Sequence, residues 1–159
     1  MRILPLTGSH DRQGFDCGRT ELNDWLQRIA RQHQDKGLSR TFVAIQENAP
    51  AIICGYYALT VAELDHSQIP ESHRNKLPRG TPGIRLGRLA VDLRYQGKGL
   101  GELLLVDALT RARRIQQEAG VVGLFVDAID EPAAGFYLRL GFSPSPGNPL
   151  LLFLPVRGP

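Results

Sequence analysis

The stretch that decides the fold reads RLGRLAV at residues 85–91, QGKGLG at residues 96–101 and ELLLVDALTRA at residues 102–112. The first segment is an apolar run of strand length, and the third carries apolar residues at helical spacing. A glycine turn therefore joins a strand to a helix. A second apolar run, VVGLFVDA at residues 121–128, follows the helix and is typical of a buried parallel strand. This order predicts a right-handed crossover between two parallel strands.

The turn at residues 96–101 has the features of an anion site. Its backbone N–H groups and the N-terminus of the following helix both attract negative charge. Glycine allows positive φ angles, and its lack of a Cβ atom lets a phosphate approach the backbone. We therefore predict phosphate binding, while a glycine-rich turn taken alone also fits a ligand-free connection.

Two familiar glycine motifs do not fit this turn. A Walker A loop requires a hydroxyl residue directly after its lysine, but Gly99 follows Lys98. A dinucleotide fingerprint requires the spacing GxGxxG and an acidic residue about twenty positions later. The chain has glycines at 97, 99 and 101 and no convincingly placed acidic residue. These observations disfavour both nucleotide-binding classes.

The rest of the chain predicts a mixed α/β sheet. Apolar and β-branched runs predict strands at residues 2–6, 41–45, 52–62, 85–91, 121–128 and 150–156, the second and third forming an antiparallel hairpin. Helices are expected from Leu22 to Gly37, from the glycine turn to Gly120, and over residues 131–140, with a short one near residues 72–77. The first helix carries an apolar stripe of Leu22, Leu26, Ile29, Ala30 and His33. We expect a single domain over residues 1–159.

The composition is that of an ordinary globular domain. The chain has 159 residues, of which 42% are hydrophobic and 22% are charged. It carries 19 Lys and Arg residues against 16 Asp and Glu residues, and its pI of about 9.1 points weakly to an acidic partner such as nucleic acid. A solvated, Arg-rich surface explains these numbers equally well.

Metal and membrane functions are not favoured. Cys17 and Cys54 belong to no CxxC pair and no Cys/His cluster, so no metal site is expected. The sequence has no apolar run of 18 residues and no signal-peptide pattern, so no membrane span is expected. We expect a cytoplasmic protein with reduced thiols.

Two of these segments resemble motifs of the GCN5-related N-acetyltransferase (GNAT) superfamily. Gln96-x-x-Gly99-x-Gly101 is similar to its pyrophosphate loop, and GFYLRLGF at residues 135–142 is similar to its C-terminal signature. FDCGRTELNDWLQRIARQHQDKGLSRTFVA at residues 15–44 resembles the toxin branch, which acetylates the α-amino group of aminoacyl-tRNA. The resemblance implies the GNAT fold, a mixed and mostly antiparallel sheet with splayed central strands and flanking helices.

The resemblance also implies the acetyl-CoA site. Tyr137 would be the general acid, because attack of an amine on a thioester expels a thiolate that takes up a proton. Pantetheine would pair with the backbone of residues 89–91, and Arg94 or Lys98 would add charge near the pyrophosphate. The cofactor-binding residues are then Leu89, Ala90, Val91, Arg94, Gln96, Gly97, Lys98, Gly99, Leu100 and Gly101. Asp130 stands where the superfamily often has Asn, and that role is not transferred.

An aminoacyl acceptor agrees with the lack of an evident general base. Glu63, His66 and Asp92 are candidates, but each is more simply a polar loop or strand-end residue. An α-amine has a pKa of about 7.7–8.0 and is partly neutral near pH 7, whereas a lysine amine near about 10.4 requires more help. Basic side chains would hold the tRNA through its phosphates. The candidates are Arg28, Arg31, Arg74, Lys76, Arg79, Arg85 and Arg88.

The toxin branch further implies two protein partners. One is a ribbon–helix–helix antitoxin whose C-terminal tail covers the active site, and the other is a second copy in a homodimer. Two other functions stay open at this point. The chain could acetylate a small-molecule amine or a protein N-terminus, or it could bind CoA or an antitoxin without turnover.

Overall fold

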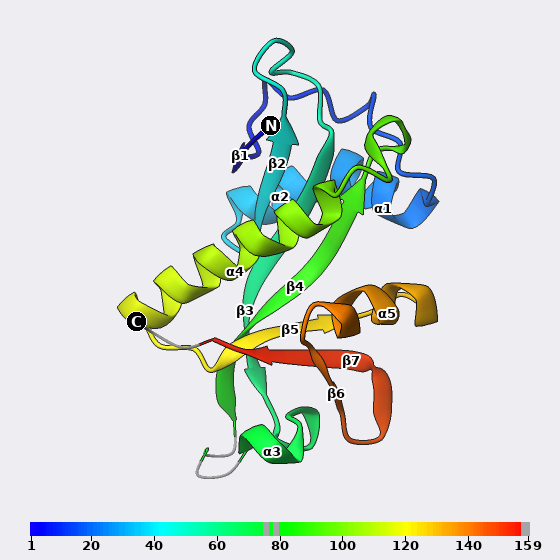
Figure 1. The fold of residues 1–159 in the computed structure, drawn as a ribbon. Coiled ribbons are helices and arrows are strands. Elements are labelled where there is room, and N and C mark those ends of the chain that lie inside the picture. Colours follow the sequence, from blue (N-terminus) through cyan, green and yellow to red (C-terminus); the bar gives the residue numbers. More distant parts are fainter. Residues whose placement is uncertain (75–76, 78–79, 157–159) are drawn as a thin grey trace. The chain divides into compact units, whose positions relative to one another are not determined.

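The structure is a computed structural model that describes residues 1–74, 77 and 80–156 (Figure 1). The strands in this part of the chain are β1 (Arg2–Pro5), β2 (Arg40–Ile45), β3 (Gly55–Leu64), β4 (Thr81–Val91), β5 (Gly123–Asp127), β6 (Ser143–Ser145) and β7 (Asn148–Pro155). The α-helices are α1 (Thr20–Asp24), α2 (Ala30–Asp35), α3 (Glu71–Arg74), α4 (Leu100–Glu118) and α5 (Glu131–Arg139). A π-helical segment, η1 (Trp25–Ile29), and two 3₁₀ segments, η2 (His66–Gln68) and η3 (Leu93–Tyr95), complete them.

The strands form one mixed sheet in the order β1-β2-β3-β4-β5-β7-β6. β1 with β2, β2 with β3, β5 with β7 and β6 with β7 are antiparallel. β4 and β5 are parallel, with Ile84 opposite Leu124 and Leu86 opposite Val126. A parallel pair needs a crossover connection, which α4 supplies. The expected mixed, mostly antiparallel sheet with flanking helices is confirmed, and the splay of the central strands stays a prediction.

The chain divides into two compact units. The first comprises Met1–Thr60 and Gly87–Ala108, and the second comprises Val61–Leu86 and Leu109–Pro159. The expectation of a single domain over residues 1–159 stays a prediction.

In the first unit, neighbouring side chains of β3 point to opposite faces of the strands. Tyr56 packs on Trp25 of η1, and its hydroxyl donates a 2.7 Å hydrogen bond to the carbonyl of Leu22. The next residue, Tyr57, points to the other face, where its hydroxyl donates to the carboxylate of Asp107 on α4. Figure 1 shows the N-terminal helices and α4 on opposite sides of these strands. The first unit therefore has helices on both faces of its strands.

The second unit is built on β5, β7 and β6. Its apolar core comprises Leu64, Ile69, Phe125, Leu151 and Phe153, with α5 packed beside β7. Gly123 is required at the start of β5, because a Cβ atom there would lie 2.6 Å from the carbonyl oxygen of Leu154 and from the Phe153 ring. The close approach of β5 and β7 therefore depends on this glycine.

The first helix departs from its expected regular form. Its middle segment, η1, is π-helical, and the N–H of Ala30 donates to the carbonyl of Trp25. The wider π turn changes the directions of the side chains within it and after it. Ile29, expected in the buried stripe, is therefore 37% exposed, whereas Leu26 and Ala30 are buried.

Two strand predictions are corrected. β4 begins at Thr81 rather than at residue 85, because the carbonyl of Pro82 accepts a 2.9 Å hydrogen bond from Val122. β6 was not expected, since its sequence SPS lacks apolar alternation. Among the described residues, no helix combines the length and the apolarity that a membrane span requires.

Candidate functional site

The glycine turn is open above its backbone. Gly97 has φ +77° and Gly99 has φ +81°, in the left-handed region that only glycine enters at little cost. A Cβ atom at either position would meet nothing within 4 Å. These glycines are therefore not required for packing within the described protein. They give the turn its path and leave its outer side accessible to a ligand.

The helix after the turn adds unpaired backbone donors. The N–H of Leu103 donates to the carbonyl of Gly99 at 3.2 Å, so the preceding N–H groups of the first turn have no acceptor within the helix. α4 runs for 19 residues, long enough for its dipole to favour an anion at this end. The predicted anion site thus has both of its expected components, successive amides and a helix N-terminus.

Close packing fixes the start of α4 on the strands. A Cβ atom on Gly55 of β3 would lie 3.0 Å from Leu104, 3.1 Å from the carbonyl oxygen of Ala90 and 3.3 Å from Leu100. Leu100 and Leu104 are both buried. The first turn of the helix is therefore held by its apolar side chains, while its N–H groups remain for a ligand.

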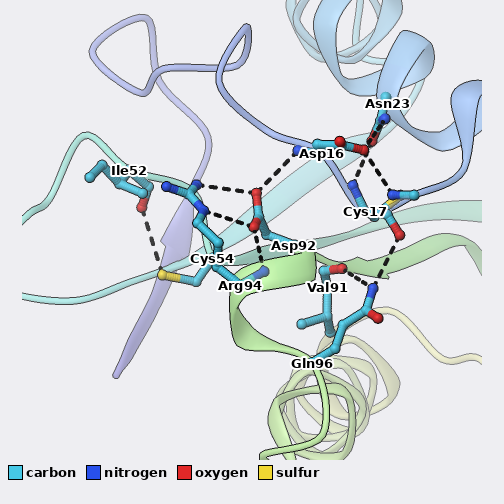
Figure 2. A network of polar contacts seen from close by, with 10 residues as sticks. Asp16, Cys17, Asn23, Ile52, Cys54, Val91, Asp92, Arg94 and Gln96 are labelled. Atoms are coloured by element: carbon cyan, nitrogen blue, oxygen red, sulfur yellow. Dashed lines mark hydrogen bonds and ion pairs between the residues drawn. The ribbon is translucent and has the colours of Figure 1, made fainter.

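A buried carboxylate lies between β4 and the turn (Figure 2). Asp92 is 2% exposed, and it accepts hydrogen bonds from the Nε, the Nη2 and the backbone N–H of Arg94, at 3.0, 3.2 and 2.9 Å. It also accepts a 3.1 Å hydrogen bond from the N–H of Asp16. Burial acts to raise the pKa of Asp92, but these hydrogen bonds outweigh it and hold the pKa below its ordinary value.

Gln96, the first residue of the turn, makes a second link. Its Nε2 donates to the carbonyl of Val91 at 2.9 Å and to the carbonyl of Cys17 at 3.1 Å (Figure 2). The side chain of Gln96 is therefore engaged within the protein. The prediction that this residue binds the cofactor then applies to its backbone.

The other predicted cofactor residues lie along one path in the first unit. Residues 89–91 end β4, with Ala90 buried in the core. The Arg94 guanidinium is bound to Asp92, so the ion pair offsets much of its charge. Lys98 is exposed on the turn. The assignment of these residues to the cofactor stays a prediction, and Lys98 suits the predicted role of a cation near the pyrophosphate better than Arg94 does.

Tyr137, the predicted general acid, lies on α5 in the second unit. It is 6% exposed, and its ring centroid is 5.1 Å from that of Phe136 and 5.4 Å from that of Phe142. Burial raises the pKa of Tyr137, so the phenol keeps its proton at all ordinary pH values. Asp130 caps the helix by accepting a 2.9 Å hydrogen bond from the N–H of Ala133. A protonated phenol in an apolar setting is able to donate a proton.

The first unit holds three of the arginines predicted to contact tRNA. Arg28 is exposed on η1. Arg31 lies against Gly8, where a Cβ atom would come within 2.9 Å of its Nη1. Arg88 has its guanidinium 5.0 Å from the Trp25 ring centroid and donates to the carbonyl of Gly87. Arg28 is thus the most accessible of the three.

Other basic residues predicted to contact tRNA belong to the second unit. Arg85 lies 3.7 Å from the carboxylate of Asp127 and 5.1 Å from the Phe125 ring centroid. Arg74 belongs to α3, and Lys76 and Arg79 lie outside the described residues. The structure does not bring all seven predicted basic residues together in one unit.

Sequence reasoning missed the residues that support the turn. Asp16 and Asp92 are separated by 76 positions, and no local pattern connects them. A signal did exist, since FDCG at residues 15–18 begins the stretch that resembles the toxin branch. His, Cys, Asp and Glu side chains in the described part of the chain form no group of three or more able to hold a metal ion.

The sequence is similar to known toxins. Residues 37–144 match the family model described as an acetyltransferase (GNAT) domain. The tRNA-acetylating toxin of Mycobacterium tuberculosis is 34% identical over 152 residues, covering 96% of this chain and 90% of that protein. The probable toxin TacT of Sinorhizobium fredii is 28% identical over 156 residues, covering 92% and 86%.

Solved toxin structures are similar over almost the whole chain. A tyrosine-to-phenylalanine mutant of KacT has a TM-score of 0.91 and 32% identity, covering 98% of this chain and 94% of that one. AtaT complexed with acetyl-methionyl-tRNAfMet has a TM-score of 0.88 and 35% identity, covering 97% and 94%. A tyrosine-to-phenylalanine mutant of AtaT, bound to the C-terminus of the antitoxin AtaR and to acetyl-CoA, has a TM-score of 0.81 and 33% identity, covering 98% and 92%.

Proposed function

The chain belongs to the GNAT acetyltransferase family, and from this we propose that it is a toxin that transfers acetyl from acetyl-CoA to the α-amino group of aminoacyl-tRNA. Such a transfer would block translation, because an acetylated α-amine cannot attack the ester that joins the growing peptide to its tRNA. The observation that carries the proposal is the open glycine turn at the N-terminus of α4, in a chain 34% identical to a tRNA-acetylating toxin.

The turn suits the pyrophosphate of acetyl-CoA. Gly97 and Gly99 leave space above the backbone, and the first N–H groups of α4 are available as donors. Lys98 adds an exposed positive charge at the same place. We propose that the pantetheine chain runs along the backbone of residues 89–91. AtaT, a structural relative, has been solved with acetyl-CoA bound.

Tyr137 is proposed as the general acid. The α-amine attacks the thioester carbonyl, a C–N bond forms, the C–S bond breaks, and the leaving thiolate takes the phenolic proton. The amine loses a proton in the same reaction, which restores the phenol. Burial raises the pKa of Tyr137, which keeps the phenol protonated at neutral pH and also makes it a weaker acid. The role therefore rests on the position of Tyr137 within the GFYLRLGF segment at residues 135–142, which resembles the C-terminal signature of the superfamily.

The proposed acceptor is the aminoacyl end of a charged tRNA. AtaT has been solved with acetyl-methionyl-tRNAfMet, which is a product of this type. An exposed Arg28 and the other predicted basic residues would bind the phosphates of the acceptor stem. The α-amine needs little help from a base, since its pKa of about 7.7–8.0 leaves part of it neutral near pH 7.

The proposed partners follow the same relatives. AtaT binds the C-terminus of the antitoxin AtaR. We propose that this chain likewise binds an antitoxin, of the ribbon–helix–helix type, and that it forms a homodimer. We also propose that residues 1–159 make one domain that acts in the cytoplasm, where charged tRNA is found.

The test is acetyl transfer from labelled acetyl-CoA to a mixture of aminoacylated tRNAs. Uncharged tRNA, free amino acids and a peptide with a free N-terminus serve as competing acceptors. Label that appears only on charged tRNA supports the proposal and identifies the preferred amino acid. Label on free amines or on the peptide assigns another acceptor, and acetyl-CoA binding without any transfer indicates a module without turnover.

A further inference from the structure

We propose that the N-terminal segment at residues 16–18 is a positioning element of the acetyl-CoA site, fixed there by Asp92, Gln96 and Asn23. The proposal rests on the proposed function, since it concerns the same cosubstrate. These residues would not contact acetyl-CoA through their side chains. They would hold the pyrophosphate turn in its binding conformation and so determine affinity for acetyl-CoA rather than the rate of acyl transfer.

Three hydrogen bonds join the segment to the chain between β4 and α4. The N–H of Asp16 donates to Asp92 at 3.1 Å, and the N–H of Leu93 donates to the carbonyl of Asp16 at 2.8 Å. The Nε2 of Gln96 donates to the carbonyl of Cys17 at 3.1 Å. The backbone that leads into the glycine turn therefore takes its position from a segment that is distant in sequence.

Van der Waals contact reinforces these bonds. A Cβ atom on Gly18 would lie 3.2 Å from Leu93, so the two chain segments touch at this point. Gly18 also has φ +87°, which lets its N–H turn back and donate to the Asp16 carboxylate at 2.9 Å. Residues 16–18 thus form a loop that is stabilised by its own internal hydrogen bond.

Asn23 of α1 completes the loop from the other side. Its Oδ1 accepts a 2.9 Å hydrogen bond from the N–H of Cys17, and its Nδ2 donates at 2.9 Å to the carboxylate of Asp16 (Figure 2). The hydrogen bonds from the N–H of Gly18 and from the Nδ2 of Asn23 lower the pKa of Asp16, so the carboxylate stays charged as an acceptor. Asn23 thereby connects the first helix to the turn through a single loop.

Two consequences separate a positioning role from a general structural one. The network lies beside the part of the chain that would bind pyrophosphate, and Tyr137 belongs to the other unit. Loosening the loop should therefore raise the dissociation constant and the KM for acetyl-CoA and leave kcat at saturation nearly unchanged. Loss of a purely structural contact would lower the amount of folded protein without this selective change.

The experiment compares variants of the full chain by calorimetric titration with acetyl-CoA and by acetyl-transfer kinetics on charged tRNA. Gln96→Leu removes both donated bonds, and we expect the dissociation constant for acetyl-CoA to rise about tenfold. Asn23→Ala leaves the turn itself untouched, and we expect a rise of about fivefold. Asn23→Asp keeps the acceptor for Cys17 and replaces the donor to Asp16 with a second carboxylate, so like-charge repulsion should loosen the loop further and raise the dissociation constant more than Asn23→Ala does. Thermal unfolding of each variant shows whether the protein is still folded at the temperature of the titration.

Glu21→Gln is the matched control, because Glu21 is an exposed residue of the same short helix. We expect it to bind acetyl-CoA as the wild type does. Wild-type affinity in Gln96→Leu and both Asn23 variants would overturn the positioning role while leaving the proposed function intact. A fall in kcat with unchanged KM would also overturn it. A wild-type protein that fails to bind acetyl-CoA would overturn both proposals.

Discussion

Around the glycine turn, the first unit gathers hydrogen-bonded polar groups, whereas around Tyr137 the second unit gathers aromatic rings. The carboxylate of Asp92 accepts four hydrogen bonds, and Gln96 donates two more. Tyr137 instead lies against Phe136 and Phe142 and is almost fully buried. The first arrangement fixes backbone donors for an anion, and the second keeps a proton on a weak acid.

From this difference we infer that acetyl-CoA binding and proton donation, as proposed for the two regions, are separable. Preorganised amides lower the cost of binding an anion but give no proton. A phenol in an apolar setting holds a proton but offers little to a pyrophosphate. Substitutions in the two regions should therefore change different kinetic constants.

The largest effect is expected from Tyr137→Phe. This change removes the proposed proton donor and retains the ring that packs on Phe136 and Phe142. We expect kcat to fall by roughly 10²–10⁴-fold, the usual contribution of general acid catalysis. The dissociation constant for acetyl-CoA should remain within about twofold of the wild-type value. Single-turnover transfer to charged tRNA and calorimetry measure the two quantities separately.

An unchanged kcat in Tyr137→Phe would remove the catalytic assignment. The pH profile provides a second check on the same residue. Because the pKa of Tyr137 is raised, its proton stays in place well above the phenol's ordinary value of about 10. No loss of kcat from ionisation of Tyr137 should therefore occur up to about pH 9.

The next effect concerns the turn, and the chain offers a closely matched control. Gly99 has φ +81° and Gly120 has φ +80°, and a Cβ atom at either would meet nothing within 4 Å. Gly99→Ala and Gly120→Ala should therefore lose similar stability, about 1–2 kcal/mol each. Only Gly99→Ala should weaken acetyl-CoA binding, by about tenfold or more, because its new methyl group faces the proposed ligand.

Calorimetry and thermal unfolding of both glycine variants test this pair. Equal losses of affinity would mean that backbone strain, not obstruction of a ligand, explains the effect. Equal retention of affinity would place the pyrophosphate elsewhere. In either case the proposal that the glycine turn binds the pyrophosphate would be wrong, and the contrast with the region around Tyr137 would not hold.

Local patterns in the sequence are sufficient to locate the glycine turn and the segment that contains Tyr137. The glycine turn and Tyr137 each lie within a few residues of their defining signals, a strand end and a helix of known period. The parallel crossover at α4 followed from the apolar run after it. Ile29 was placed wrongly because a π-helical turn depends on tertiary contacts that helical spacing does not contain.

The supporting network could not be predicted for a different reason. Asp16 and Asp92 meet across 76 positions, and Asp16 contributes to this contact a backbone N–H that any residue except proline would supply. The same holds for Gln96, whose two acceptors are carbonyl groups. Residue identity carries no information about such backbone partners, so only the folded chain reveals them.

A smaller effect is expected where the first unit would contact tRNA. Arg28 is exposed on η1, and Arg28→Glu should weaken binding of charged tRNA by about threefold to tenfold at low salt. Arg113→Glu makes the same charge change on an exposed position of α4 and serves as control. Binding measured across a salt series should show a reduced slope for Arg28→Glu alone. Equal effects of the two variants would indicate that tRNA binding depends only on the net charge of the protein and not on the position of Arg28.

The smallest expected effect is a change in how the stability of the protein depends on pH, caused by Asp92 in the polar region. The pKa of Asp92 is lowered in the folded protein, so its ionised form contributes stability above about pH 4, the ordinary range of an Asp pKa. That contribution disappears as the pH falls through the lowered pKa of the folded state. Asp92→Asn should lower the melting temperature by a few degrees at pH 7 and by less near pH 3. Thermal unfolding between pH 7 and pH 3 measures how this difference narrows, with Asp35→Asn at an exposed position of α2 as control. A difference in melting temperature that stays constant from pH 7 to pH 3 would show that the charge of Asp92 does not stabilise the turn. The polar region would then be held by packing, as the aromatic region around Tyr137 is.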